Sequence, residues 1–138
     1  LRRGRAEAQA AALDLLGLVG MAEQAARICG ELAYGDVKRV ELAIALANAP
    51  RLLLMDEPTA GMAPKERTTL MSLAARTARE RQAAVLFTEH DMDVVFGHAT
   101  RVLVINRGRL IAAGSPAEVR ANPEVKAVYL GSTAMPVG

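Results

Sequence analysis

The sequence predicts an α/β fold, with a mostly parallel sheet that ends in an antiparallel hairpin and a helical segment ahead of the sheet. Two patterns lead to this prediction. Short apolar runs alternate with amphipathic helical stretches after residue 50, and a glycine-containing turn joins the last two runs. The alternation is typical of parallel strands connected by helical crossovers, whereas the tight turn is typical of antiparallel strands.

The first predicted elements are helices. Residues 5–16 are rich in alanine, the strongest helix former, and Gly17 can close this helix. Residues 18–34 show no clear pattern. From residue 37 to residue 47, apolar side chains recur with the spacing of one helical stripe, and this second helix should stop before Pro50.

Two short strands with a helix between them come next. Residues 52–55 are a continuous apolar run between two prolines, which is typical of a strand buried on both faces. Residues 65–81 are predicted to be an amphipathic helix, with arginines near the end where the helix dipole is negative. Residues 84–87 are the second apolar run. A sheet of so few parallel strands is normally covered on both faces and edges, so we expect further strands ahead of residue 1.

A short helix and a hairpin follow the second strand. Asp91 can cap the helix, because its carboxylate accepts hydrogen bonds from first-turn amides. Residues 102–105 are the third apolar run. The order of strands and helices predicts that this run is a third strand of the parallel sheet. Residues 106–108 should then reverse the chain into a strand at residues 110–112, because their glycine tolerates the positive φ of tight hairpin turns.

Two helix starts are clear local signals near the end of the chain. Residues 115–118 read Ser-Pro-Ala-Glu, a capping box with proline at the first helical position. Asn122-Pro123 opens a last short helix that should end at Gly131. With these elements we expect a helical subdomain at residues 1–49 and the sheet-containing core at residues 50–138.

Composition limits the function classes. The chain is 51% hydrophobic, its formal net charge is only +2, and it has two Tyr and two Phe. Scattered charges and few aromatic rings do not predict a nucleic-acid surface. The single Cys29 cannot form an internal disulfide, and it suits a reducing compartment. No apolar run approaches the roughly 20 residues of a membrane span, so we expect a soluble protein, truncated or processed because it lacks an initial methionine.

Candidate catalytic residues follow the first two strands. Asp56 and Glu57 are adjacent carboxylates, of which one could hold Mg²⁺ and the other could polarise an attacking water. Polar strand ends also serve simple solvation, so both interpretations stand here. His90 follows the second strand and should emerge at the same sheet edge, where open α/β sheets bind ligands. Its imidazole could hydrogen-bond a γ-phosphate or the water, or it could be an ordinary surface histidine.

A second candidate site lies directly before the helix at residues 37–47. Its residues are Leu32, Ala33, Tyr34, Gly35 and Asp36. A helix N-terminus with a glycine in its approach attracts phosphate through its amides and dipole. Asp36 stabilises the first turn by about 0.3–1 kcal/mol but repels the same phosphate. Judged alone, the segment is therefore interpreted as an ordinary capped helix.

Together these elements resemble the ATP-binding-cassette (ABC) family over essentially the whole chain. Residues 32–36 stand at the signature loop, and residues 52–56 resemble the Walker B strand. Glu57 stands at the catalytic base, residues 59–63 at the D-loop and His90 at the switch histidine. The Leu-Ala-Tyr-Gly signature, the Ala-Gly-Met-Ala-Pro-Lys-Glu stretch and Asn-Pro-Glu-Val near the end resemble ATPases of branched-chain amino acid importers most closely.

The resemblance implies the C-terminal part of a P-loop NTPase domain that uses ATP and Mg²⁺. Asp56 would hold Mg²⁺ through water, and Glu57 would be the general base. The signature loop would touch the ATP of a second ABC ATPase subunit. Transmembrane permease subunits would be further partners, placing the protein in the cytoplasm, on the inner face of the cell membrane, where hydrolysis would drive amino-acid uptake.

The sequence also departs from the family pattern. Ala33 and Asp36 replace the usual serine and glutamine, and Ala63 replaces a usual aspartate or asparagine. No glycine is followed by lysine, so the phosphate loop is expected upstream of Leu1. The isolated chain should expose apolar surface and self-associate. A non-catalytic docking or regulatory module is the alternative function, and a chromosome- or repair-associated ATPase is a third.

Overall fold

The computed structural model describes residues 2–130 and divides into two compact units, Leu1–Thr88 and Glu89–Gly138. The first unit contains α1 (Arg2–Leu18), the 3₁₀ turns η1 (Ala22–Gln24) and η2 (Cys29–Glu31), α2 (Tyr34–Leu46), β1 (Leu52–Asp56), α3 (Pro64–Glu80) and β2 (Ala84–Thr88). The second unit contains α4 (Met92–His98), β3 (Val102–Asn106), β4 (Arg109–Gly114), α5 (Pro116–Ala121), α6 (Pro123–Val125) and a π-helical turn, η3 (Lys126–Leu130).

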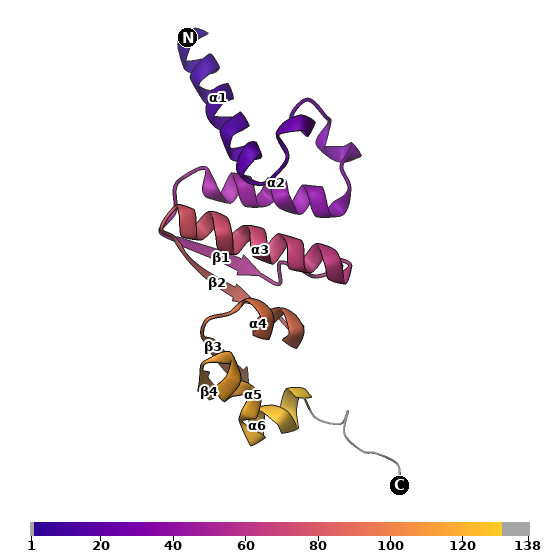
Figure 1. Ribbon diagram of the computed structural model, residues 1–138, viewed down its shortest axis with the longest axis vertical. Coiled ribbons are helices and arrows are strands. Elements are labelled where there is room, and N and C mark those ends of the chain that lie inside the picture. The colour runs from indigo at the N-terminus through magenta and orange to yellow at the C-terminus, as the bar shows by residue number, and fades with distance from the viewer. Residues whose placement is uncertain (1, 131–138) are drawn as a thin grey trace. The chain divides into compact units, whose positions relative to one another are not determined.

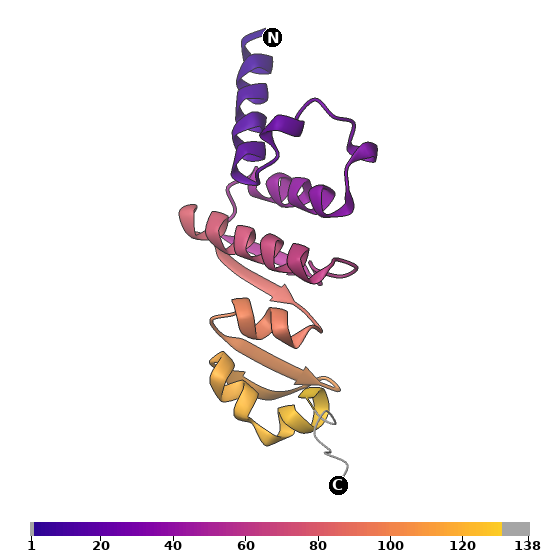
Figure 2. The same cartoon turned by 45° about the vertical axis from the view of Figure 1, so that its right-hand side comes forward.

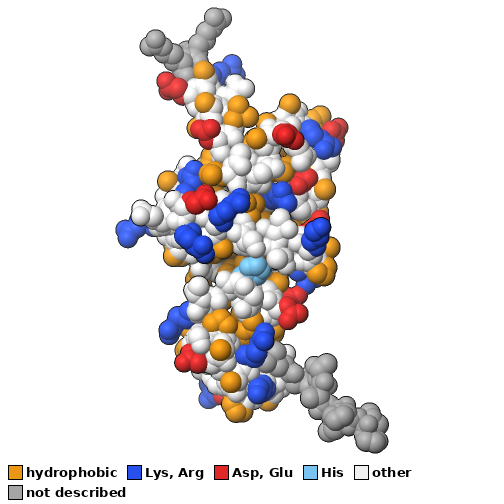
Figure 3. Space-filling view, viewed as in Figure 1, with side chains coloured by type: hydrophobic (Ala, Val, Ile, Leu, Met, Phe, Trp, Pro, Cys, Tyr) orange, Lys and Arg blue, Asp and Glu red, His pale blue; other side chains and the backbone are white. Residues whose placement is uncertain are grey.

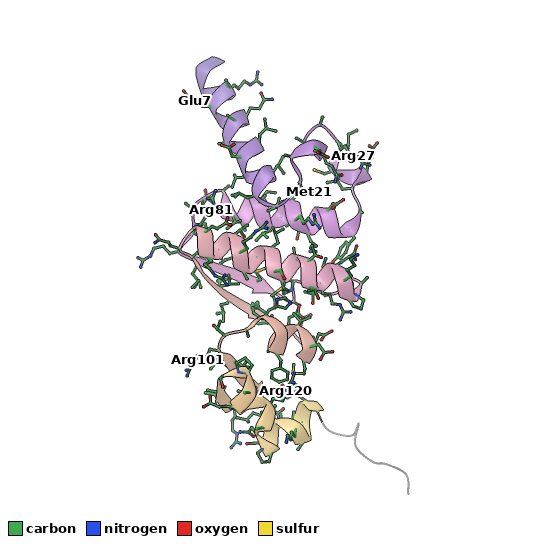
Figure 4. All side chains as sticks on the ribbon, viewed as in Figure 1. Glu7, Met21, Arg27, Arg81, Arg101 and Arg120 are labelled. Atoms are coloured by element: carbon green, nitrogen blue, oxygen red, sulfur yellow. The ribbon has the colours of Figure 1, made fainter. Side chains whose placement is uncertain are left out.

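The first helix runs further than predicted. α1 passes through Gly17, and the chain turns instead at Gly20, whose φ is 72°. The amide of Gly20 donates to the Gly17 carbonyl (3.1 Å) and the amide of Met21 donates to the Leu16 carbonyl (2.8 Å), the two bonds of a Schellman motif. Gly20 is thus the closing glycine, because a positive φ costs glycine little. Met21 then enters the core, only 2% exposed (Figure 4).

The stretch that gave no sequence pattern contains two short 3₁₀ turns. Neither η1 nor η2 has a buried residue. Ile28, next to η2, is 69% exposed. Hydrophobic periodicity arises where one face of an element is buried. Val19 and Met21 are buried at the start of this stretch, but no residue from 22 to 31 is, so the two turns carry no period to detect.

β1 and β2 are a parallel pair covered by helices on one face. α2 and α3 lie side by side over this pair (Figures 1 and 2), and Leu53 of β1 belongs to the same buried cluster as residues of both helices. The other face is apolar and exposed, at Leu52 (49%), Leu54 (67%) and Leu86 (55%). Burial of the first strand on both faces, predicted from its continuous apolar run, is therefore wrong for the described residues. The expected apolar surface is present, and self-association stays a prediction.

The second unit is built on an antiparallel pair. β3 and β4 are joined by Arg107 and Gly108, both with positive φ (48° and 77°). The sequence predicted the hairpin and the positive φ of its glycine, but not that of Arg107. Within the described residues β3 pairs with β4 and not with β2, so the three runs do not form one parallel sheet. A crossover fixes strand direction but not adjacency, since successive strands are neighbours only about two-thirds of the time.

The predicted helix caps in the second unit are confirmed. The Asp91 carboxylate accepts from the amides of Asp93 (2.9 Å) and Val94 (3.3 Å) at the start of α4. The side-chain oxygen of Asn122 likewise accepts from two first-turn amides of α6. The predicted end of the last helix, Gly131, lies outside the described residues. A small core of Val102, Val119 and Val125 joins the hairpin to these helices.

The charges on the described surface are mixed. Figure 3 shows basic and acidic side chains interspersed with hydrophobic ones over the visible face. None of the helices in residues 2–130 combines the length and the apolar character needed to cross a membrane.

Candidate functional site

The carboxyl end of the β1–β2 pair brings three polar residues together. Asp56, the last residue of β1, lies in register with Thr88, the last residue of β2. The Thr88 hydroxyl donates to Asp56 Oδ1 at 2.5 Å. The amide of Glu57 donates both to Thr88 Oγ1 (3.1 Å) and to the Thr88 carbonyl oxygen (3.0 Å). The two exposed carboxylates singled out in the sequence thus lie at the edge where parallel sheets bind ligands.

Glu57 lies just beyond the strand, in a left-handed backbone conformation. Its φ is 45°, which is uncommon for a non-glycine residue. Such residues cost of order 1–3 kcal/mol and cluster at functional sites. The Glu57 carbonyl accepts from the Ala60 amide (3.1 Å), so a turn begins at this residue. The direction of the Glu57 side chain is therefore set by the turn and not by alternation along a strand.

The signature segment forms the start of α2. Ala33 is the extended residue before the helix, and its carbonyl accepts from the amides of Asp36 and Val37 (3.0 Å each). Gly35 consequently lies inside the first helical turn, whereas the sequence analysis placed it in the approach. The Asp36 carboxylate accepts from Gln24 Nε2 at 3.4 Å. Leu32 packs against the core of the first unit.

The signature segment also contacts the D-loop segment, a connection that the sequence analysis missed. The Tyr34 hydroxyl donates to the Ala60 carbonyl oxygen at 3.2 Å. A Cβ added to Gly35 would lie 3.3 Å from Glu66 Oε1, so this glycine packs closely against the first turn of α3. Met62, 4% exposed, anchors the D-loop segment in the core. Two motifs that are separate in the sequence thus form one surface in the first unit.

A basic side chain lies beside Tyr34 on α2. Lys38 Nζ lies 5.4 Å from the centre of the Tyr34 ring and 2.8 Å from Glu41 Oε2. The hydrogen bond to Glu41 raises the pKa of Lys38 above its usual 10.5. Its ion pair with Glu41 is a surface pair between residues one turn apart, which contributes little to stability.

The oxygen donors at the sheet edge are of the kind that Mg²⁺ prefers. Among residues 2–130 no group of three or more His, Cys, Asp or Glu side chains could hold a metal ion. At phosphoryl-transfer sites Mg²⁺ keeps several waters and binds through one or two carboxylates plus substrate phosphates. The Asp56 carboxylate, exposed and oriented by Thr88, fits such a ligand set. His90 is an exposed residue of the second unit, immediately before the α4 cap.

Comparison with known proteins identifies the family. A model described as "ABC transporter" matches residues 3–60, and one described as "Branched-chain amino acid ATP-binding cassette transporter" matches residues 109–134. The high-affinity branched-chain amino acid transport ATP-binding protein LivG of Salmonella typhimurium is 41% identical over 130 residues, which are 94% of this chain and 51% of LivG. BraF of Pseudomonas aeruginosa, which has the same description, is 42% identical over the same shares.

The chain belongs to the ABC transporter ATPase family. This ABC ATPase chain spans about half the length of the curated relatives it matches. Two solved structures have the same fold over the matched residues. The ADP conformation of MJ1267, an ATP-binding cassette of an ABC transporter, matches with a TM-score of 0.79 and 29% identity, covering 88% of this chain and 49% of MJ1267. The structure of cbiO1 from Clostridium perfringens matches with a TM-score of 0.80 and 31% identity, covering 89% and 49%.

The comparisons confirm both the fold class and the family resemblance inferred from the sequence. In this ABC ATPase chain, Thr88 is the residue at the candidate site that sequence reasoning passed over. Residues 88–91 read Thr-Glu-His-Asp, but Thr88 becomes meaningful only through the strand register that sets it opposite Asp56.

Proposed function

We propose that these residues belong to the ATP-binding subunit of an ABC importer, in which ATP hydrolysis drives the uptake of branched-chain amino acids. The carboxylate edge of Asp56 and Glu57, held by Thr88, is the observation that carries this proposal. The names of LivG and BraF, branched-chain amino acid transport ATP-binding proteins, support the choice of solute.

Each candidate residue has a role in this proposal. Glu57 acts as the general base on the attacking water, and Asp56 holds Mg²⁺ through water. Mg²⁺, when bound, neutralises charge on the phosphates. His90 contacts the γ-phosphate. The signature residues contact the ATP bound by a second subunit, and they are Leu32, Ala33, Tyr34, Gly35 and Asp36.

The partners follow from the same proposal. A second ABC ATPase subunit faces the signature segment, and transmembrane permease subunits carry the solute. The protein then works in the cytoplasm, peripherally on the inner face of the cell membrane. The division into a helical subdomain at residues 1–49 and a core at residues 50–138 stays a prediction.

The test is Glu57→Gln in a full-length ABC ATPase that contains these residues. Loss of a general base should lower hydrolysis by roughly 10²–10⁴-fold while ATP binding is retained. Glu80→Gln, an exposed carboxylate at the end of α3, is the matched control and should leave the rate unchanged. A Glu57→Gln protein that hydrolyses ATP at the wild-type rate would refute the base assignment.

Direct measurement can distinguish the alternative function, a non-catalytic docking module, from an importer ATPase. The docking module is favoured by Ala33 and Ala63, which have no polar side chain at two positions where the family usually has one. Calorimetric titration of the 138 residues with Mg-ATP should show no binding, because they contain no phosphate loop. Hydrolysis by the full-length protein then decides between the two functions, since a docking module would not turn over ATP.

A further inference from the structure

One hydroxyl group connects the two candidate carboxylate residues. Thr88 Oγ1 donates its hydrogen to Asp56 Oδ1 (2.5 Å) and accepts the amide hydrogen of Glu57 (3.1 Å). The amide of Glu57 is shared with the Thr88 carbonyl oxygen at 3.0 Å. Thr88 therefore bonds to the side chain of one residue and to the backbone of the next.

The direction of these bonds is fixed by their chemistry. A hydroxyl group has one hydrogen, and an ionised carboxylate can only accept, so the hydrogen points to Asp56. Hydrogen bonds to an ionised group are about twice as strong as neutral ones. A lone pair of the same oxygen is left for the Glu57 amide. The carboxylate of Asp56 is thereby restrained in rotation, with one of its oxygens held by the neighbouring strand.

The second bond acts where the backbone is strained. Glu57 has a φ of 45°, a conformation that a non-glycine residue keeps only when its surroundings impose it. Its amide is held by two oxygen atoms of Thr88, one from the side chain and one from the backbone. Only the side-chain half of this restraint depends on the identity of residue 88.

We propose that Thr88 is a positioning residue for ATP hydrolysis, which orients the Asp56 carboxylate and the Glu57 backbone through its hydroxyl group. This inference rests on the proposed function. Thr88 acts through these two residues and not on the nucleotide. A hydroxyl that merely stabilised the end of β2 would change the unfolding free energy and leave the turnover of the folded protein unchanged.

The test compares Thr88→Val, which keeps the shape and removes the hydroxyl, with Thr88→Ser, which keeps the hydroxyl. In a full-length ABC ATPase containing these residues, the Val variant should lose about tenfold in kcat, as expected for a lost hydrogen bond to a charged group. The Ser variant should stay within about twofold of wild type. Thr69→Val is the matched control, because it removes a threonine hydroxyl bonded to the Lys65 carbonyl (2.9 Å) at an exposed position of α3.

A second readout does not depend on turnover. Hydrogen exchange of the Glu57 amide should be faster in Thr88→Val than in wild type and should return to the wild-type rate in Thr88→Ser. If Thr88→Val does not fold, Thr88→Ala provides the same comparison with less crowding at the strand end. Equal kcat in the wild-type and hydroxyl-free proteins would overturn the proposal, and so would a Ser variant as impaired as Val.

The two proposals can fail separately. If Glu57→Gln abolishes hydrolysis while Thr88→Val does not affect it, the importer ATPase function stands and the role of Thr88 is wrong. If Glu57→Gln retains the wild-type rate, the catalytic assignment itself fails.

Discussion

The helices α3 and α5 begin with the same local pattern and complete it differently. Each follows an extended residue and begins with a proline, and each carries a glutamate whose carboxylate accepts from the amide of that extended residue. Glu66 accepts from Ala63 at 3.1 Å, and Glu118 accepts from Ser115 at 2.7 Å. Only Ser115 returns a bond, from the Glu118 amide to its hydroxyl (3.3 Å), so the capping box is complete only in α5.

Both glutamates also pack against a glycine, and here the two helix starts differ most. At α5 the glycine is Gly114, the residue just before the box. At α3 it is Gly35, which comes from the signature segment. The complete box therefore serves its own helix, whereas the half box shares its carboxylate with a segment distant in the sequence. One four-residue pattern can thus be purely structural in one place and part of a candidate site in another.

Gly114→Ala is expected to have the largest effect on the unfolding free energy. A Cβ at this position would lie 2.6 Å from Glu118 Oε2, so Glu118 must move and its bond to Ser115 is lost. Loss of this capping hydrogen bond should lower the unfolding free energy by about 1–3 kcal/mol, as measured by urea denaturation. Gly97→Ala is the control, because nothing lies within 4 Å of its added Cβ and alanine favours the helix. A Gly114→Ala protein as stable as wild type would show that Glu118 can rearrange without cost.

Exchanging the two cap residues should give effects of opposite sign. Ser115→Ala removes the returned bond and should cost about 1 kcal/mol, whereas Ala63→Ser can complete the second box and should gain up to about the same amount. Both are measured as shifts in the urea midpoint at constant slope. If Ala63→Ser gives no gain while Ser115→Ala costs the expected amount, the start of α3 is held in a geometry that its own cap does not control.

Sequence predicted the parts of the fold that depend on a few neighbouring residues. The cap at Asp91, the box at residues 115–118 and the turn at Gly108 are each local, because partner groups lie within about four residues. The closing glycine of α1 lies three residues beyond the predicted one, since Gly17 and Gly20 are both able to close a helix and the burial of Met21 in the core favours Gly20.

Features that depend on distant residues could not be read from the sequence. The positions of Asp56 and Glu57 at a strand end were predicted, but the bond from Thr88 requires the register between β1 and β2. The contact of Gly35 with Glu66 requires α2 to pack against α3. An apolar run such as β1 shows that side chains avoid water without showing which face is covered, and Leu54 is accordingly exposed.

A smaller effect is expected from Gly35→Ala. The added Cβ would lie 3.3 Å from Glu66 Oε1, close enough to push the flexible carboxylate but not to exclude it. Alanine in the first turn of α2 gains helix propensity, so the net change in unfolding free energy should stay within about 0.5 kcal/mol. Faster hydrogen exchange at the Ala63 amide would report the displaced carboxylate. Unchanged exchange would mean that the half box does not depend on the signature segment.

The smallest effect concerns the charge of the complete box. Hydrogen bonds from the Ser115 amide and hydroxyl lower the pKa of Glu118 below its usual 4.5. Because the folded state holds the ionised form, this contribution is present above pH 4.5 and is lost as the pH falls through the lowered folded-state pKa. Glu118→Gln keeps the acceptor oxygen without the charge, so its deficit in unfolding free energy should be constant near neutral pH and shrink in acid. If the stability deficit of Glu118→Gln stays constant in acid, the charge of Glu118 does not contribute and the capping box of α5 acts through its geometry alone.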